Sequence, residues 1–122
     1  MHSPRPVDDA LRWQLDRVGS AAWEGWCLKF QLMAYGFVEE PGVAGAGEAL
    51  DWLTARSAVR HDEPPPRGKL VWYADGDTVT VMSSVDGGRV VGTGVNDSVG
   101  IIGYRDRPGY VGWTEPIFPY AG

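Results

Sequence analysis

Cysteine and histidine are scarce in this sequence. It contains one cysteine, Cys27, and two histidines, His2 and His61. A single cysteine excludes a disulfide within the chain, and so few cysteine and histidine side chains offer no metal-ligand spacing. Glycine-rich phosphate loops of the Walker or dinucleotide type are also missing. We therefore expect no bound metal and no cofactor, and a fold stabilised by its hydrophobic core.

The sequence also lacks an excess of positive charge and any long apolar run. Lysine and arginine number 11 against 16 aspartate and glutamate residues, which gives a net charge of −5. An acidic domain repels phosphate backbones, so we expect no nucleic-acid partner. No segment approaches the roughly 18 apolar residues of a membrane span, and the N-terminus lacks the apolar centre of a secretory signal. We expect a protein that is cytoplasmic as synthesised and that leaves the cell, if at all, in another vehicle such as a virion.

Glycine, proline and tryptophan are, by contrast, abundant. The 122 residues include 17 glycines, 9 prolines and 6 tryptophans. These counts predict many tight turns and a few large aromatic packing sites, and they argue against a helical bundle. The length is typical of one domain, and we treat residues 1–122 as such.

The first half of the chain has helical patterning. After a proline-containing arm over residues 1–6, apolar side chains recur at helical spacing over 7–18, 25–35 and 48–56. Glycines follow the first two of these segments, as expected where helices end. We therefore predict a helical half over residues 7–56.

The second half changes character at Pro64–Pro66. Serial prolines cannot continue a helix, and short β-like runs separated by glycine or aspartate turns follow them. These runs cover residues 70–73, 78–82, 89–91, 99–104 and 110–113, within a β half over 67–116. Helices segregated from a later sheet predict an α+β class, with N-terminal helices packed on a C-terminal antiparallel sheet of about five strands.

Cys27 is placed where the second predicted helix begins. Unpaired backbone N–H groups and the helix dipole at that end favour a thiolate, which is the nucleophilic form. An activated cysteine also needs a base, usually histidine. The alternative is a small buried apolar side chain, since free cysteine is among the most buried residue types.

The order of several short motifs resembles the CHAP-type (cysteine, histidine-dependent amidohydrolase/peptidase) domains of papain-like cell-wall hydrolases from actinobacteria and their phages. The resemblance spans about residues 22–116. It is carried by Trp26-Cys27-Leu28-Lys29-Phe30, Ala49-Leu50-Asp51-Trp52, His61, Pro64-Pro65-Pro66-Arg67-Gly68, Val71-Trp72, Gly88-Arg89-Val90 and Gly109-Tyr110-Val111-Gly112-Trp113-Thr114-Glu115. It implies a papain-like fold with Cys27 as the catalytic nucleophile.

The resemblance breaks at the base. In such domains a histidine begins the second strand, where this chain has Thr78, or Asp77 if the register shifts by one residue. The polar residue that orients the histidine would fall at Thr93. Neither threonine can accept a proton near neutral pH, so the chain retains Cys27 but lacks the expected base and its orienting residue. His61 is the first candidate for a substitute base, and His2 is the second.

Two further expectations follow from the resemblance. Trp26, Trp72 and Trp113 are expected to pack in the core and to line a groove able to bind sugar or peptide. The leading function is a catalytically degenerate domain, a pseudoenzyme that binds or assembles with a protein partner or with its own copies, for example as an accessory protein of a phage particle, with peptidoglycan as a further ligand. The alternatives are an active cysteine peptidase or amidase that cuts peptidoglycan stem peptides, and an inhibitor or immunity-like partner of a hydrolase.

Overall fold

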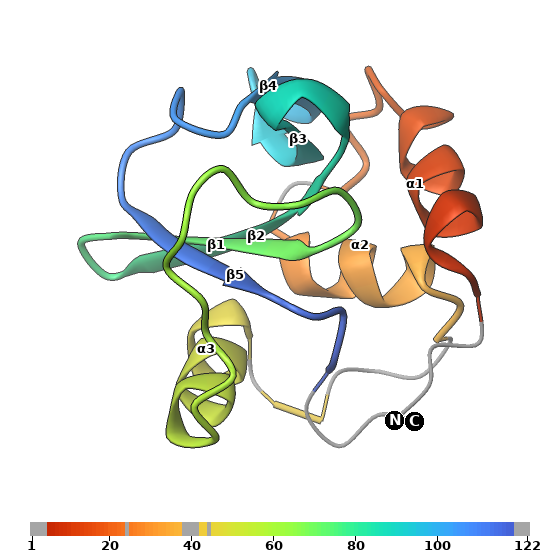
Figure 1. Cartoon of the computed structure of the whole chain (residues 1–122). Coiled ribbons are helices and arrows are strands. Elements are labelled where there is room, and N and C mark those ends of the chain that lie inside the picture. The colour runs from red at the N-terminus through yellow and green to blue at the C-terminus, as the bar shows by residue number, and fades with distance from the viewer. Residues whose placement is uncertain (1–4, 24, 38–41, 44, 119–122) are drawn as a thin grey trace.

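The fold is α+β, with helices followed by an antiparallel sheet, as predicted. The computed structural model describes residues 5–23, 25–37, 42–43 and 45–118 (Figure 1). The helices in this part are α1 (Val7–Leu15), α2 (Cys27–Ala34) and α3 (Ala46–Ala55), with a short 3₁₀ turn at Asp86–Gly88. The strands are β1 (Leu70–Asp75), β2 (Thr78–Ser84), β3 (Arg89–Val95), β4 (Ser98–Gly103) and β5 (Tyr110–Thr114).

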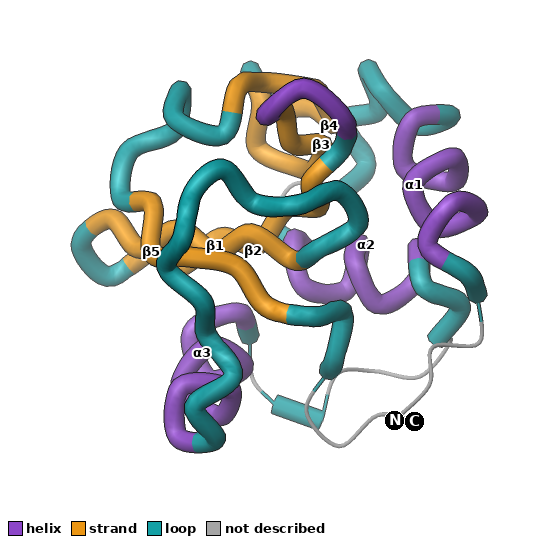
Figure 2. The backbone as a smooth tube through the Cα atoms, in the orientation of Figure 1, coloured by secondary structure: helices purple, strands orange, loops and turns teal. Residues whose placement is uncertain are grey.

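The sheet has the order β4-β3-β2-β1-β5, and every neighbouring pair is antiparallel. The pairing is uneven. β1 pairs with β2 along its whole length, whereas β2 pairs with β3 through two residues, Ser83 and Ser84. The N-terminal part of β2 therefore diverges from β3, and β3 and β4 stand apart from the layer formed by β1, β2 and β5 (Figure 2).

The first two helices are shorter than the sequence pattern predicts, and a glycine explains the later start of α2. Gly25 has a φ of +78°, which is incompatible with a helix, so α2 begins at Cys27 rather than at residue 25. Gly19 has a φ of +95°, and its N–H donates to the carbonyl of Val99 in β4. The chain after α1 is thus bound to the sheet instead of continuing the helix to residue 18.

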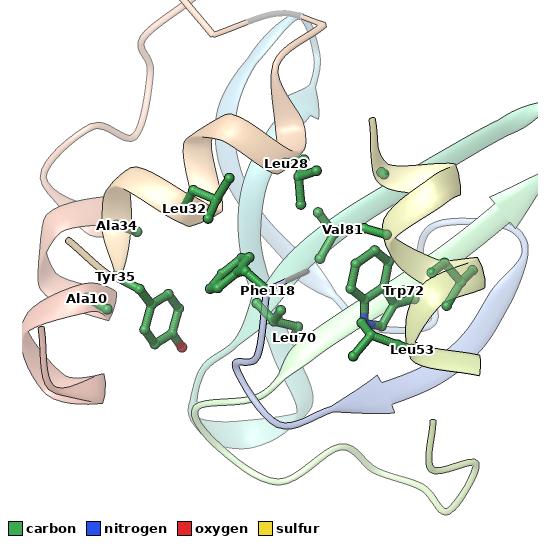
Figure 3. Close-up of a cluster of buried hydrophobic side chains, with 13 residues drawn as sticks. Ala10, Leu28, Leu32, Ala34, Tyr35, Leu53, Leu70, Trp72, Val81 and Phe118 are labelled. Atoms are coloured by element: carbon green, nitrogen blue, oxygen red, sulfur yellow. The ribbon is translucent and has the colours of Figure 1, made fainter. Parts of the chain in front are cut away.

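The main hydrophobic core lies between the helices and one face of the sheet. Figure 3 shows Leu28 and Leu32 of α2 and Leu53 of α3 pointing toward Trp72 and Val81 of β1 and β2. These five side chains are all buried. This cluster fixes α2 and α3 against the central strands, and Cys27 packs at its margin.

A second cluster covers the opposite face of the sheet. It is built from Val71, Tyr73, Met82, Val90 and Trp113, all buried. Because side chains alternate along a strand, Trp72 and Tyr73 of β1 belong to different faces and different clusters. The side chains of β1 and β2 therefore lie either on the face covered by the helices or on the face of the second cluster.

Three fully buried polar side chains form a closed ring between α1, α2 and β2. Gln14 Nε2 donates to Ser83 Oγ at 3.0 Å, Ser83 Oγ donates to Gln31 Oε1 at 2.5 Å, and Gln31 Nε2 donates to Gln14 Oε1 at 3.0 Å. Each side chain gives one hydrogen bond and accepts one, so each is satisfied by the other two. The ring joins both helices to the strand that carries the candidate site.

Candidate functional site

Cys27 occupies the first turn of α2, as predicted, and it lies against strand β2. Its Sγ is 4.0 Å from the carbonyl oxygen of Val79, and the side chain is partly buried against the main core. The arrangement of a cysteine-bearing helix packed on an antiparallel sheet therefore exists in this chain.

The surroundings of the thiol favour its protonated form. Burial raises the pKa of Cys27 above its usual value. Backbone groups of Val81 and Leu28 and the charge of Arg107 act in the opposite direction, but burial has the larger effect on this pKa. No histidine is among the groups that influence the thiol in the described part of the chain. The helix N-terminus alone does not make this sulfur a thiolate.

Thr78, the position that the resemblance gives to the base, faces away from Cys27. Thr78 pairs with Asp75 and Thr80 pairs with Tyr73, and these four residues line one cavity on the sheet face opposite the helices. Val79 instead belongs to the main core together with Cys27. An apolar residue thus occupies the strand position beside the sulfur. Asp77 is exposed in the turn that precedes β2.

Thr93, the position of the orienting residue, is buried in β3 with 4% of its surface exposed. Its carbonyl oxygen accepts a hydrogen bond from Arg107 Nη2 at 3.3 Å, and the same nitrogen donates to Gly94 O at 2.8 Å. Arg107 also lines the cavity of Thr78. One arginine therefore connects the two positions at which the resemblance expects a histidine and its partner.

His61 lies at the far edge of the sheet from β2. The preceding residue, Arg60, forms an antiparallel bridge with Trp113 of β5, and His61 Nδ1 is 2.9 Å from the carbonyl oxygen of Val111. Strand β1 lies between β5 and β2, so two strand spacings, roughly 10 Å, separate the backbone segments beside the two side chains. His61 is exposed and does not act on the thiol. His2 lies outside the described residues.

The three tryptophans predicted to line a groove lie in different surroundings in the described structure. Trp72 is completely buried and its Nε1 donates to Thr114 Oγ1 at 3.0 Å. Trp113 is 9% exposed and belongs to the cluster on the other face of the sheet. Trp26 is 54% exposed at the start of α2, with Lys29 Nζ 5.4 Å from its ring centre. Two of the three side chains are thus core residues, because β1 and β5 place them on opposite faces.

Arg107 is the residue of this region that sequence reasoning missed. It precedes Pro108 in the connection between β4 and β5, which carries no recognisable motif. Its Nε is buried and has no hydrogen-bond partner in the described structure. Thr93 and Gly94 lie where β3 pairs with neither β2 nor β4, so their carbonyl groups are available to this side chain. No local sequence pattern predicts this interruption.

Within the described residues, no three His, Cys, Asp or Glu side chains are grouped so that they could hold a metal ion. A search of the same part of the chain finds no helix of the length and apolarity that crossing a membrane requires. Comparisons with family models, with curated proteins and with solved structures find no match to this chain.

Proposed function

We propose that this chain is a catalytically degenerate, papain-like domain of the CHAP type that acts by binding or assembly rather than by hydrolysis. The observation that carries the proposal is the position of Cys27 Sγ beside the backbone of β2, 4.0 Å from Val79 O, with no histidine acting on it among the described residues. The placement of Cys27 in the first turn of α2, packed on the sheet, supports the papain-like arrangement.

The chemistry of acyl transfer explains why this geometry argues against hydrolysis. A cysteine hydrolase needs a thiolate and a group within about 3 Å that returns the proton to the leaving amine. Here burial raises the thiol pKa, and Val79 offers a carbonyl that cannot act as an acid or base near neutral pH. General-base assistance is commonly worth 10²- to 10⁴-fold in rate, so a domain without it retains little activity.

The surface next to the first turn of α2 is suited to binding. Trp26, directly before Cys27, is 54% exposed. An exposed tryptophan can stack on a sugar ring or bury against a partner protein. The proposed ligands are peptidoglycan and a protein partner, with a phage particle as one setting for the latter.

The test of catalysis uses purified, labelled cell walls. We expect the wild-type protein and Cys27→Ala to release equally little soluble fragment. If peptidoglycan is the ligand, both proteins should cosediment with the walls. If a protein is the ligand, both should co-assemble with that partner. Trp26→Ala should reduce cosedimentation, whereas Leu15→Ala, a matched change at another exposed apolar residue (42% exposed), should not. Fragment release that disappears in Cys27→Ala, with its far-UV circular dichroism unchanged, would reject the proposal and favour an active peptidase or amidase.

Thiol reactivity supplies a second, independent measurement. We expect iodoacetamide to alkylate native Cys27 at pH 7.5 more slowly than it alkylates the same cysteine in denaturant, because burial raises the pKa and limits access. Faster reaction in the native state would show an activated nucleophile and contradict the proposal.

A further inference from the structure

A cavity of about 200 Å³ opens on the sheet face opposite the helices. It is lined by Tyr73, Asp75, Thr78, Thr80, Arg107 and Pro108. The four strand residues come from the paired ends of β1 and β2, where Tyr73 is opposite Thr80 and Asp75 is opposite Thr78. The cavity therefore combines an aromatic ring, two hydroxyl groups and two opposite charges on a rigid two-stranded support.

Arg107 is held in place within this wall. Its Nη2 donates to the carbonyl oxygens of Thr93 and Gly94, and its guanidinium carbon is 6.0 Å from the centre of the Tyr73 ring. Its Nε is buried without a hydrogen-bond partner in the described structure. A buried donor without a partner is unfavourable in the free protein, so a carboxylate that accepts hydrogen bonds from this guanidinium would offset part of that cost.

Asp75 brings the opposite charge to the same cavity. It ends β1 and is exposed, and it forms no ion pair with Arg107 although both side chains line the cavity. The hydroxyl groups of Thr78 and Thr80 lie along the strand beside them. A separated cation and anion in one small cavity match a ligand that carries both charges itself.

We infer that this cavity binds a small zwitterion of the α-amino-acid type, as a free amino acid or as the zwitterionic end of a larger molecule. Arg107 would bind the carboxylate, Asp75 the ammonium group, and the two threonine hydroxyls the remaining polar atoms. The volume agrees with this class, because about 200 Å³ is the space that six or seven waters occupy in the liquid, comparable to the non-hydrogen atoms of alanine or serine. The inference does not depend on the proposed function, because Cys27 packs on the other face of the sheet, although the charge of Arg107 also lowers the pKa of that thiol.

The experiment is a titration of the full ¹⁵N-labelled chain followed by amide chemical shifts. The probes are L-alanine and D-alanine as zwitterions, acetate as the carboxylate alone, and ethylammonium as the ammonium alone. We expect one alanine enantiomer to shift the amides of Thr78 and Thr80 saturably, and to bind at least about tenfold more tightly than acetate or ethylammonium.

Charge variants test the two contacts separately. Asp75→Asn and Arg107→Lys should each weaken alanine binding by about tenfold, and Arg107→Lys keeps the positive charge in case Arg107 is needed for folding. Asp97→Asn and Arg89→Lys are the matched controls, because both residues are exposed and do not line the cavity; Asp97 lies in the β3–β4 turn and Arg89 begins β3. The controls should bind alanine as the wild type does.

Three outcomes would overturn the inference. The first is an absence of saturable shifts at Thr78 and Thr80 with either enantiomer. The second is acetate binding as tightly as alanine, with Asp75→Asn tightening both, which would mean a simple anion site. The third is a set of shifts confined to Asn96 and Ile102, because these residues line the neighbouring cavity of about 350 Å³ that Arg107 also borders.

Discussion

Val79, and not Thr78, is the β2 residue beside Cys27, with its carbonyl oxygen 4.0 Å from the sulfur. Thr78 faces the opposite side of the sheet, in the cavity that Arg107 borders. The strand alternation that separates the two residues therefore decides where a base could act on this thiol. A histidine one residue further along the chain would face the sulfur, and a histidine at the position suggested by family resemblance would not.

This alternation gives a prediction about introduced histidines. Val79→His should lower the apparent pKa of the Cys27 thiol, because a protonated imidazole beside the sulfur favours the thiolate. Thr78→His should leave that pKa unchanged and serves as the matched control. The measurement is the pH dependence of iodoacetamide alkylation in both variants. Equal pKa shifts in the two proteins would refute the assigned faces.

Tyr35 makes the free energy of unfolding depend on pH in the alkaline range. Burial raises the pKa of its hydroxyl to about 12, from a usual value near 10. The folded state thus binds the proton more tightly than the unfolded state, and its full stability is present below pH 10 and declines as the pH rises toward 12. We expect the free energy of unfolding to fall by on the order of 2 kcal/mol between pH 10 and pH 12.

The matched variant for Tyr35 is phenylalanine. Tyr35→Phe should lose less stability between pH 10 and pH 12 than the wild type, since the ionising group is gone while the ring still packs against Phe118. Other buried tyrosines keep their own dependence in both proteins, so the difference between the two urea-denaturation series isolates Tyr35. Parallel series would contradict the prediction.

The ring of Gln14, Gln31 and Ser83 predicts a non-additive response to mutation. Ser83→Ala removes the hydroxyl that accepts from Gln14 Nε2 and donates to Gln31 Oε1. These two buried polar atoms are then left without those partners. We expect a loss of about 2 kcal/mol or more in the free energy of unfolding. The triple variant with leucine at both glutamines should lose less than Ser83→Ala alone, as measured by urea denaturation. Ser98→Ala, whose hydroxyl bonds within a turn, should be nearly neutral. A triple variant that loses the most would argue against the closed ring.

Two glycines should respond in opposite directions to alanine. A Cβ at Gly112 of β5 would lie 2.2 Å from the carbonyl oxygen of Arg60, so Gly112→Ala must displace the segment that covers this edge of the sheet. A Cβ at Gly47 of α3 would make an ordinary contact of 3.7 Å with Val79, and alanine favours the helix. We expect thermal unfolding to show a loss of about 2 kcal/mol for Gly112→Ala and a gain of up to about 1 kcal/mol for Gly47→Ala. Equal changes in the free energy of unfolding for the two variants would contradict the close contact of Gly112 with Arg60.

Hydrophobic periodicity, with the positions of glycine and proline, predicted which segments of this chain are helices and which are strands. The predicted strand at 78–82 is observed over Thr78–Ser84, and the predicted helix at 48–56 is observed over Ala46–Ala55. These elements follow local rules, namely alternation in strands and apolar spacing in helices. The predicted ends failed where a glycine with positive φ intervened, as at Gly25, since sequence does not say which glycines adopt that conformation.

The candidate site was less predictable because it depends on how strands meet. Cys27 was found from its place at the start of a helix, and the structure keeps it there. Trp72 and Trp113 look alike in sequence, but pairing of β1 with β5 buries them in different clusters. Arg107 gave no signal, because its contacts depend on the interrupted pairing of β3 with β2 and β4, which is a tertiary property.

The closed ring of buried polar side chains has a consequence for how this sequence can change over generations. A substitution at one member leaves one buried polar atom on each of the other two without its partner, whereas a joint replacement by apolar residues removes the need for those hydrogen bonds. Homologous chains should therefore either keep Gln14, Gln31 and Ser83 as a set or lose all three together. The three positions should therefore vary together, although they lie up to 69 residues apart in the chain.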